Sequence, residues 1–333
     1  MTKAQTQGVR ITVMLPVRNG MPYLTETLAS LEAQTERDWE IIAWDNSSSD
    51  GSLEELHRWI PARLPGRIIA DKPLTYGKAV GEMLLMARTE LCAIAHQDDI
   101  HLPERLEKQS AFMDHRPEVA LLSARFRRMD SQGVIGEEVT PFYTAHDDLV
   151  HYMMLENGFG APLAMLRRRA VLEVGNHRDN RHVEDYDLWM RLAMRYKVAN
   201  LPDCLLHYRI HERGGSSVAT AAGEMSGAAA QCFVQHAPAL FGCSTQEAEK
   251  LRARQLVLAA PTFVRIARHL AGTQGGSTLQ RLRSVSFLDS ARGLLRPGDY
   301  LTRFLFALLD KRLSLARHGG RVIRRAFNRF LRG

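Results

Sequence analysis

The sequence predicts an α/β fold, with a mostly parallel, Rossmann-like sheet flanked by helices and followed by an all-helical C-terminal region. Short apolar, β-branched runs alternate with segments of helical periodicity over residues 9–124, and this alternation favours a parallel sheet with right-handed crossovers. Two of the runs are followed directly by acidic clusters, at residues 45–51 and 96–99. From about residue 221 onward only helical periodicity remains.

The first seven expected elements alternate between strand and helix. Pro16 ends the first apolar run, the following helix repeats Leu at positions 24, 28 and 31, and a Ser-rich segment caps the next helix. The expected elements are a strand at 9–15, a helix at 23–34, a strand at 38–44, a helix at 52–60, a strand at 67–70, a helix at 77–88 and a strand at 91–95.

Beyond residue 100 the pattern continues less regularly. The expected elements are a helix at 103–115, a strand at 119–124, a loop-rich region at 130–160, a helix at 169–174 and an amphipathic segment with an acidic start at 184–192. A chain of 333 residues exceeds one typical domain. We therefore expect a main domain over residues 1–218 and a helical C-terminal region over residues 219–333.

The composition is that of an ordinary soluble protein, with 45% hydrophobic and 24% charged residues. No apolar run approaches the ~20 residues that span a bilayer, and the polar N-terminus has no signal-peptide core. Cys92, Cys204, Cys232 and Cys243 are scattered and form no C-x-x-C pair, which is typical of reduced thiols. These features predict a cytoplasmic location.

Basic charge is concentrated at the C-terminal end of the chain. Residues 296–333 hold ten Lys/Arg and two Asp/Glu, a net charge of +8, against +7 for the whole chain. Because the remainder is close to neutral, nucleic-acid binding is not expected. The basic segment repeats aromatic and aliphatic residues at helical spacing. This pattern fits a helix lying on an anionic membrane surface or a helix packed on the protein.

The two acidic clusters follow strands, where open α/β sheets bind their ligands. Asp50 fits a turn that caps the next helix, whereas Asp45 and Asn46 stand at the strand end and could accept hydrogen bonds from a nucleotide base. Asp98 and Asp99 follow a buried strand, where adjacent carboxylates are costly unless they are used. Mg²⁺ or Mn²⁺ prefers one or two carboxylates together with phosphate oxygens, so this cluster predicts a metal site.

Two later segments carry further candidates. The acidic run Glu184–Asp187 either complements the dipole of a helix N-terminus or supplies a general base for an incoming hydroxyl. In the extended segment 207–211, alternation places His207, Arg209 and His211 on one face. Arg209 and His211 could bind a diphosphate or help to coordinate a metal ion. The alternative is that both are structural.

Taken together, these motifs resemble the family-2 glycosyltransferases, inverting enzymes with the GT-A-type nucleotide-diphospho-sugar fold. The resemblance covers about residues 9–218, and several linked motifs in the right order make it specific. The matching segments are Val13–Gly20, Asp45–Gly51, Gln97–Gln109, Glu184–Leu192 and Tyr208–His211.

The resemblance implies a role for each candidate residue. Asp185 is the implied catalytic base, with Glu184 and Asp187 as secondary candidates. Asp99 and His211 are implied to hold Mg²⁺ or Mn²⁺. The remaining implied contacts are Arg209 on the diphosphate side and, for the nucleotide, Pro16, Val17, Asn19, Asp45, Asn46, Lys78 and Asp98.

The sequence departs from the family pattern at three positions. His96 replaces the first carboxylate of the metal motif, and Asn46 stands where many relatives have a second Asp. Gly81 stands at the Asn of the family's Arg-Asn pair. Lys78 either compensates for that loss or is a solvated helix lysine.

The implied reaction moves a sugar from a nucleotide-diphosphate donor, with a UDP-sugar favoured, to a saccharide or lipid-linked saccharide. It proceeds by one metal-assisted, inverting displacement. The resemblance further implies a role in surface polysaccharide synthesis. Residues 296–333 would bind the protein to the inner face of the cell membrane. One alternative is a non-catalytic nucleotide-sugar-binding relative, which His96 and Gly81 favour. A sugar-nucleotide pyrophosphorylase is the other alternative, and the single basic residue in Pro16–Gly20 disfavours it.

Overall fold

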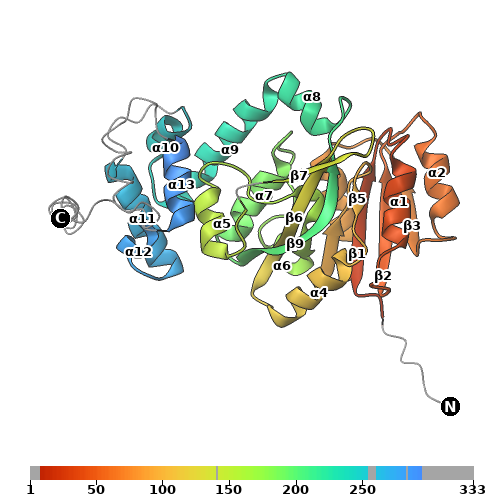
Figure 1. Cartoon of the computed structure of the whole chain (residues 1–333), viewed down its shortest axis with the longest axis horizontal. Helices are drawn as coiled ribbons and strands as arrows, with labels where there is room; N and C mark the ends of the chain where they lie inside the picture. The colour runs from red at the N-terminus through yellow and green to blue at the C-terminus, as the bar shows by residue number, and fades with distance from the viewer. Residues whose placement is uncertain (1–7, 140–141, 254–259, 283, 295–333) are drawn as a thin grey trace, which may run out of the picture. The chain divides into compact units, whose positions relative to one another are not determined.

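The computed structural model describes residues 8–139, 142–253, 260–282 and 284–294 (Figure 1). The basic segment 296–333 lies outside these residues, so its membrane role stays a prediction. The chain divides into two compact units, one made of residues 1–144 and 159–229 and the other of residues 145–158 and 230–333. The expected domain boundary near residue 218 also stays a prediction.

The first unit is built on a nine-stranded sheet. The order is β3-β2-β1-β4-β8-β6-β9-β5, and β7 pairs with β6. The strands are β1 (Ile11–Val17), β2 (Trp39–Asp45), β3 (Gly66–Ala70), β4 (Leu91–Ile94), β5 (Ile100–His101), β6 (Val119–Met129), β7 (Ile135–Glu138), β8 (Met165–Arg167) and β9 (Lys197–Arg209).

Strand direction differs between the two halves of this sheet. Strands β1, β2, β3 and β4 are all parallel, because a helix crosses over between each of them and the next. Strand β8 is antiparallel to β4 and β6, β5 is antiparallel to β9, and β7 forms a hairpin with β6. Strands β6 and β9 are again parallel. The predicted α/β class is confirmed, but the sheet is mixed rather than mostly parallel: its parallel pairs are those of the first half and the pair β6–β9.

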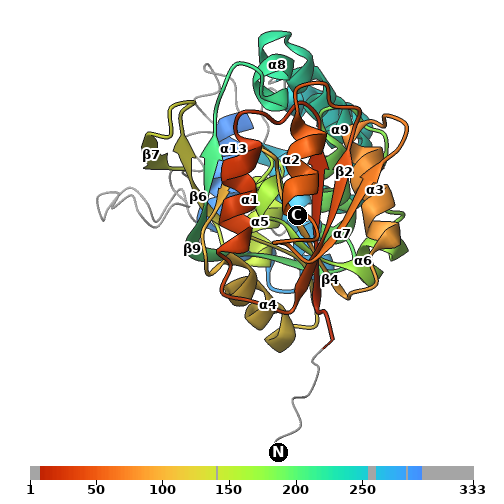
Figure 2. The same ribbon diagram turned by 90° about the vertical axis from the view of Figure 1, so that its right-hand side faces the viewer.

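Helices cover both faces of the sheet (Figures 1 and 2). On one face, the leucines of α1, α2 and α4 pack with the alternate residues Val13 and Leu15 of β1. On the other face, α3 packs against β1 and β2, and α7 packs against β6 and β9. The helices of this unit are α1 (Leu24–Glu32), α2 (Ser52–Trp59), α3 (Tyr76–Met86), α4 (Arg105–His115), α6 (Arg168–Glu173), α7 (Glu184–Ala193) and α8 (Gly215–Ala221), with a 3₁₀ turn at Ala161–Leu163.

Every regular element in the described residues of the second unit is a helix, as the sequence predicts for the region from about residue 221 onward. The unit contains α5 (His146–Tyr152), most of α9 (Glu224–Phe241), α10 (Thr245–Arg252), α11 (Ala260–Gln274), α12 (Thr278–Leu282) and α13 (Val285–Leu294). Phe263 and Phe287 pack edge to face in its core, and a capping box of Ser244 and Glu247 begins α10. In the part of the chain that the structure describes, every helix is too short or too polar to cross a bilayer.

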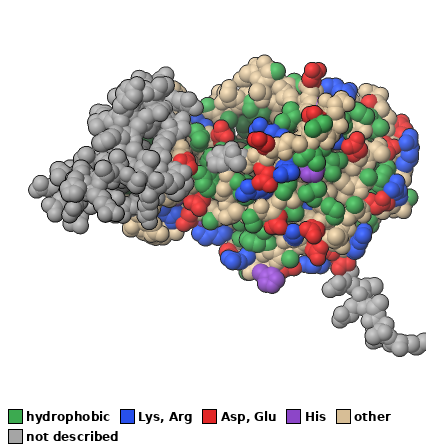
Figure 3. Space-filling model, in the orientation of Figure 1, with side chains coloured by type: hydrophobic (Ala, Val, Ile, Leu, Met, Phe, Trp, Pro, Cys, Tyr) green, Lys and Arg blue, Asp and Glu red, His purple; other side chains and the backbone are tan. Residues whose placement is uncertain are grey.

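The surface carries charges of both signs. On the face drawn in Figure 3, acidic and basic side chains of the described residues are interspersed among apolar ones. Surface ion pairs of the first unit include Arg63 with Glu32 and Lys108 with Asp203. On this face, therefore, charge is not sorted by sign.

Candidate active site

The segments that follow β1, β2 and β4 meet at one edge of the sheet, because these strands are parallel. The backbone N–H of Asn46 donates to the carbonyl of Val17 (2.7 Å). The carboxamide of Gln97 pairs with the backbone of Arg18, accepting from its N–H (2.7 Å) and donating to its carbonyl (3.0 Å). These bonds bring the acidic clusters that follow β2 and β4 next to the loop that follows β1.

Asp45 ends β2 with one carboxylate oxygen unused. Its Oδ2 accepts the N–H of Ser48 (3.2 Å), whereas Oδ1 is buried and has no hydrogen-bond partner among the described residues. The residue is only 3% exposed. A buried acceptor without a donor is costly, so this oxygen is suited to an N–H from a ligand such as a nucleotide base.

Asn46, expected to contact the nucleotide, is engaged by the protein. Its Nδ2 donates to the carbonyl of Leu74 (2.7 Å), and its Oδ1 accepts the N–H of Leu74 (2.6 Å). This two-point pairing holds the segment that precedes α3 against the end of β2. A carboxamide both donates and accepts, so it can pair with a peptide group in this way, and the contact of Asn46 with the nucleotide stays a prediction.

The other residues expected to contact the nucleotide differ in the protein contacts that they already make. Pro16 and Val17 lie at the end of β1, and Asn19 has a positive φ of 52°. Asn19 binds the β2 loop through the N–H of Ser49 (2.9 Å). Lys78, on the outer side of α3, forms an ion pair with the half-exposed Asp179 (2.7 Å). A ligand would have to share or replace that pair.

Asp98 and Asp99 form the acidic turn of the site. Asp99 is 0% exposed, its Oδ1 accepts the backbone N–H of Arg209 (2.8 Å), and its Oδ2 is buried without a partner among the described residues. Burial and the charge of Asp98 raise the pKa of Asp99 well above its usual range. Two adjacent carboxylates held this way favour a cation between them.

His96 completes a set of residues that fits a divalent cation. Ligand atoms of His96, Asp98 and Asp99 all lie within 4.8 Å of one another. The Nε2 atom of His96 lies 2.8 Å from the hydroxyl of Tyr76, and burial lowers the pKa of His96, which favours the neutral imidazole that metals bind. His211, the expected second ligand, lies 2.9 Å from Asp98 Oδ2 through its Nε2. The sequence analysis did not include His96 among the candidate metal ligands.

Helix α7 places Glu184 and Asp185 near this turn. Glycine at position 77 of α3 permits the segment 178–184 to pack closely against α3, because a Cβ on Gly77 would lie 2.7 Å from the carbonyl oxygen of Arg178 and 3.1 Å from Glu184 Cβ. Burial raises the pKa of Tyr76, and the charges of Glu184, Asp185 and Asp99 raise it further. Tyr76 is thus within electrostatic range of both the acidic start of α7 and the acidic turn.

Within that run the carboxylates have different environments. Asp185 is half-buried, and its Oδ1 accepts the N–H of Tyr186 (2.7 Å). Glu184 has a buried Oε2 with no hydrogen-bond partner among the described residues, and burial raises the pKa of Glu184 to about 7. A carboxyl that titrates near neutral pH is suited to proton transfer.

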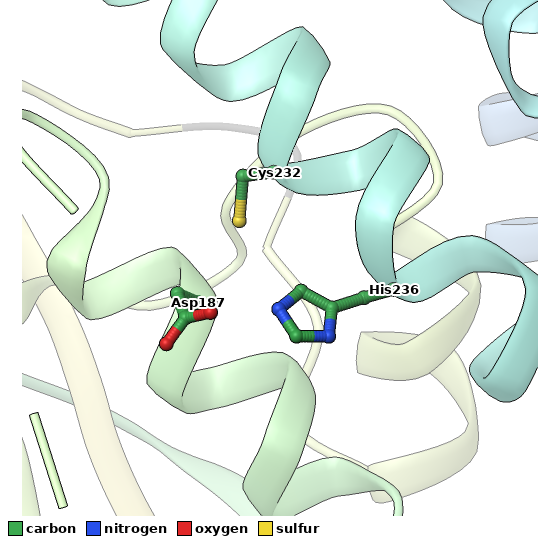
Figure 4. Close-up of side chains that lie close together, drawn as sticks. All are labelled: Asp187, Cys232 and His236. Atoms are coloured by element: carbon green, nitrogen blue, oxygen red, sulfur yellow. The ribbon is translucent and has the colours of Figure 1, made fainter. Parts of the chain in front are cut away.

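Asp187, a secondary candidate base, is held by arginines of its own unit. It is 0% exposed, and Arg191 binds its Oδ2 through Nε (2.9 Å) and Nη2 (2.6 Å). Figure 4 shows the carboxylate of Asp187 on α7. Because Asp187 carries this ion pair, its environment is that of a structural carboxylate.

Arg209, expected on the diphosphate side, is buried at the end of β9. It is 3% exposed; its Nη2 donates to Glu26 (2.6 Å), and its Nε donates to the carbonyl of Asp98 (2.9 Å). The guanidinium carbon lies 4.4 Å from the ring centre of Tyr23. Sequence reasoning missed Glu26 and Tyr23, because each is an ordinary residue of a helix start and only the fold brings it to Arg209.

Replacing Glu184 with Gln is expected to stabilise the protein at high pH. Because the folded pKa of about 7 lies above the unfolded value of 4.5, the free energy of unfolding falls as pH rises from about 4.5 through 7. Glutamine carries no charge to bury, so the variant should gain about 3 kcal/mol at pH 8 and little at pH 5. Urea unfolding at both pH values, without divalent cations, measures this. An equal change in the free energy of unfolding at both pH values would contradict the raised pKa of Glu184.

Comparison with solved structures defines the class of fold. TarS 1–349 of S. aureus, solved in complex with UDP-GlcNAc, matches 89% of this chain and 90% of its own with a TM-score of 0.54 and 16% identity. The mannosyltransferase PcManGT from Pyrobaculum calidifontis, solved with GDP-Man and Mn²⁺, matches 91% of this chain and 86% of its own, with a TM-score of 0.54 and 18% identity. The chain therefore has the GT-A fold of nucleotide-sugar transferases.

Sequence comparison assigns the family. The family model for glycosyl transferase family 2 matches residues 12–175. The amylovoran biosynthesis glycosyltransferase AmsE of Erwinia amylovora is 32% identical over 189 residues, which cover 56% of this chain and 70% of AmsE. The O-antigen biosynthesis glycosyltransferase WbnJ of Escherichia coli is 25% identical over 215 residues, covering 63% and 84% of the two chains. The chain belongs to glycosyltransferase family 2, as the resemblance of its motifs indicated.

Proposed function

We propose that this transferase moves a sugar from a nucleotide-diphosphate donor to a hydroxyl of a saccharide or lipid-linked saccharide, with inversion at the anomeric carbon. The observation that carries the proposal is that two buried carboxylate oxygens, Asp45 Oδ1 at the end of β2 and Asp99 Oδ2 in the turn after β4, have no hydrogen-bond partner among the described residues. Asp45 Oδ1 can accept a base N–H, and Asp99 Oδ2 can bind a cation beside the phosphates.

Each residue of the site has a task in a single displacement. Asp45 accepts from the base and fixes the nucleoside, and Asp185 takes the proton of the attacking hydroxyl. His96, Asp98 and Asp99 would hold Mg²⁺ or Mn²⁺. When bound there, the ion neutralises the charge that develops on the leaving diphosphate.

The relatives support the proposed donor and acceptor classes. TarS was solved with UDP-GlcNAc and PcManGT with GDP-Man and Mn²⁺; we favour a UDP-sugar for this chain. AmsE and WbnJ are named for amylovoran and O-antigen biosynthesis, so we propose a role in surface polysaccharide synthesis. Peripheral binding to the inner face of the cell membrane through residues 296–333 belongs to the same proposal, because that segment is basic and amphipathic.

A non-catalytic nucleotide-sugar-binding protein is the second candidate, and the surroundings of Gly81 favour it. Asn176 donates from its Nδ2 to the carbonyl of Gly81 (3.1 Å) and occupies the space next to it. A side chain from another segment thus stands where family members present one from α3. The buried acidic turn and the carboxylate of Asp185 favour the catalytic alternative.

Thermal stabilisation by UDP, GDP, dTDP and CMP, with and without Mn²⁺, tests the proposal. A rise in melting temperature with one diphosphate, larger with Mn²⁺, is expected and identifies the donor base. Stabilisation of about 3 kcal/mol corresponds to a nucleotide concentration of 100 times its Kd. No shift with any nucleotide, with or without Mn²⁺, would contradict both the transferase and the nucleotide-sugar-binding candidate.

A further inference from the structure

Helix α1 and strand β9 together hold the turn that carries Asp98 and Asp99. The hydroxyl of Thr27, in the first turn of α1, donates to the carbonyl of Asp99 (2.9 Å). Arg209 donates its backbone N–H to Asp99 Oδ1 (2.8 Å) and its Nε–H to the carbonyl of Asp98 (2.9 Å). Three acceptors of the turn are therefore fixed from outside it, and Asp99 Oδ2 is left for a ligand.

The guanidinium of Arg209 is itself held by α1. Its Nη2 donates to the carboxylate of Glu26 (2.6 Å), and the ring of Tyr23 lies against it at 4.4 Å. Nε and Nη2 of one planar group thus bind two protein acceptors in different directions. Lysine, which has a single ammonium, cannot reproduce this fork. With 3% exposure, Arg209 has the surroundings of a structural link rather than of a phosphate ligand.

We propose that Glu26 is a positioning residue that acts through Arg209 to set the orientation of the Asp98–Asp99 turn for the divalent cation, an inference that rests on the proposed function. Glu26 is 59% exposed at its side chain, so it neutralises the buried guanidinium while remaining in contact with water. Its place in the first turn of α1 also complements the helix dipole. Arg209 accordingly contacts the turn, and the diphosphate is bound by other groups.

Removal of the Glu26 charge leaves a buried guanidinium without its counter-ion, which is strongly unfavourable. The guanidinium is expected to move toward water, and its bond to the carbonyl of Asp98 weakens. Residues behind metal ligands typically change metal affinity by about 10- to 100-fold when they are substituted. An ion pair that only supports the fold would lower overall stability and leave metal affinity unchanged.

The test compares Glu26→Gln and Arg209→Lys with Glu54→Gln in the full chain. Glu54 is a matched control, because it is an exposed carboxylate in the first turn of α2. Hydrogen exchange of the peptide that spans residues 98–101 is measured without metal, and Mn²⁺ affinity is measured calorimetrically in the presence of the stabilising nucleoside diphosphate. We expect faster exchange at this peptide and about tenfold weaker Mn²⁺ binding in both test variants, with neither change in Glu54→Gln.

Each outcome decides for or against the proposal. Wild-type exchange at residues 98–101 in Glu26→Gln would overturn it, even if the variant unfolds more easily. Loss of metal-free nucleotide affinity in Arg209→Lys, with unchanged exchange, would overturn it in favour of a diphosphate contact. A wild-type protein that binds neither Mn²⁺ nor any nucleotide contradicts the proposed function, and the exchange rates then still decide whether Glu26 positions the turn.

Discussion

Replacing Asp185 with Asn is expected to lower kcat by about 10³-fold, within the range typical of a lost general base. Asparagine preserves the size of the side chain and can still accept the N–H of Tyr186, but it cannot take a proton from the acceptor hydroxyl. Nucleoside diphosphate affinity should stay within about twofold, because an effect confined to the chemical step leaves ground-state binding intact. Steady-state kinetics of sugar transfer and calorimetry with the diphosphate measure the two quantities.

The control for this variant is Asp114→Asn. Asp114 lies on α4 and pairs with Arg10, which precedes β1 and so stands at the opposite edge of the sheet. Its kcat should equal that of the wild type. If Asp185→Asn retains full kcat and Glu184→Gln loses it, the base is Glu184, and the proposed role of Asp185 is wrong.

Replacing Asp99 with Asn is expected to remove the dependence of nucleotide binding on Mn²⁺. A neutral carboxamide keeps the bond to the backbone of Arg209 but supplies a weaker oxygen and no charge to the cation. Metal affinity should fall by at least about tenfold, in line with the effect of altering a metal site. Titration of Mn²⁺ into the protein with saturating diphosphate gives this affinity directly.

The metal-free protein offers an independent readout of the same variant. Because the wild-type carboxylate is buried beside Asp98 and its pKa is raised, the neutral variant avoids a repulsion that the wild type carries. We expect Asp99→Asn to be more stable than the wild type without metal and less stabilised by nucleotide with metal. An unchanged Mn²⁺ affinity would show that Asp99 is not a ligand.

Much of the fold and the position of the site could be predicted from the sequence, because both depend on local patterns. Apolar runs that alternate with amphipathic segments predict parallel strands, and parallel strands place their carboxyl ends at one edge. The clusters at Asp45 and Asp98 follow such runs, so their proximity could be predicted without knowing the order of the strands in the sheet. The directions of β8 and β5 were not readable in this way, because short strands carry little pattern.

The roles of individual side chains were harder to predict, because they depend on contacts between distant segments. Arg209 and Glu26 are 183 positions apart, and no local pattern relates them. Asn46 pairs with the backbone of Leu74, a bond that exists only because β3 returns beside β2. Asp187 is a partial exception, because Arg191 follows it by four residues, which is the spacing of an ion pair within a helix.

The most direct measurement of the central claim is release of nucleoside diphosphate from a panel of UDP-, GDP- and dTDP-sugars, each with Mn²⁺ and a mixed saccharide acceptor. We expect the wild type to release diphosphate from one donor class, chelation of the metal to stop the release, and Asp185→Asn to lower its rate about 10³-fold. Release at the same rate by Asp185→Asn, or release from no donor despite nucleotide binding, would contradict sugar transfer at this site.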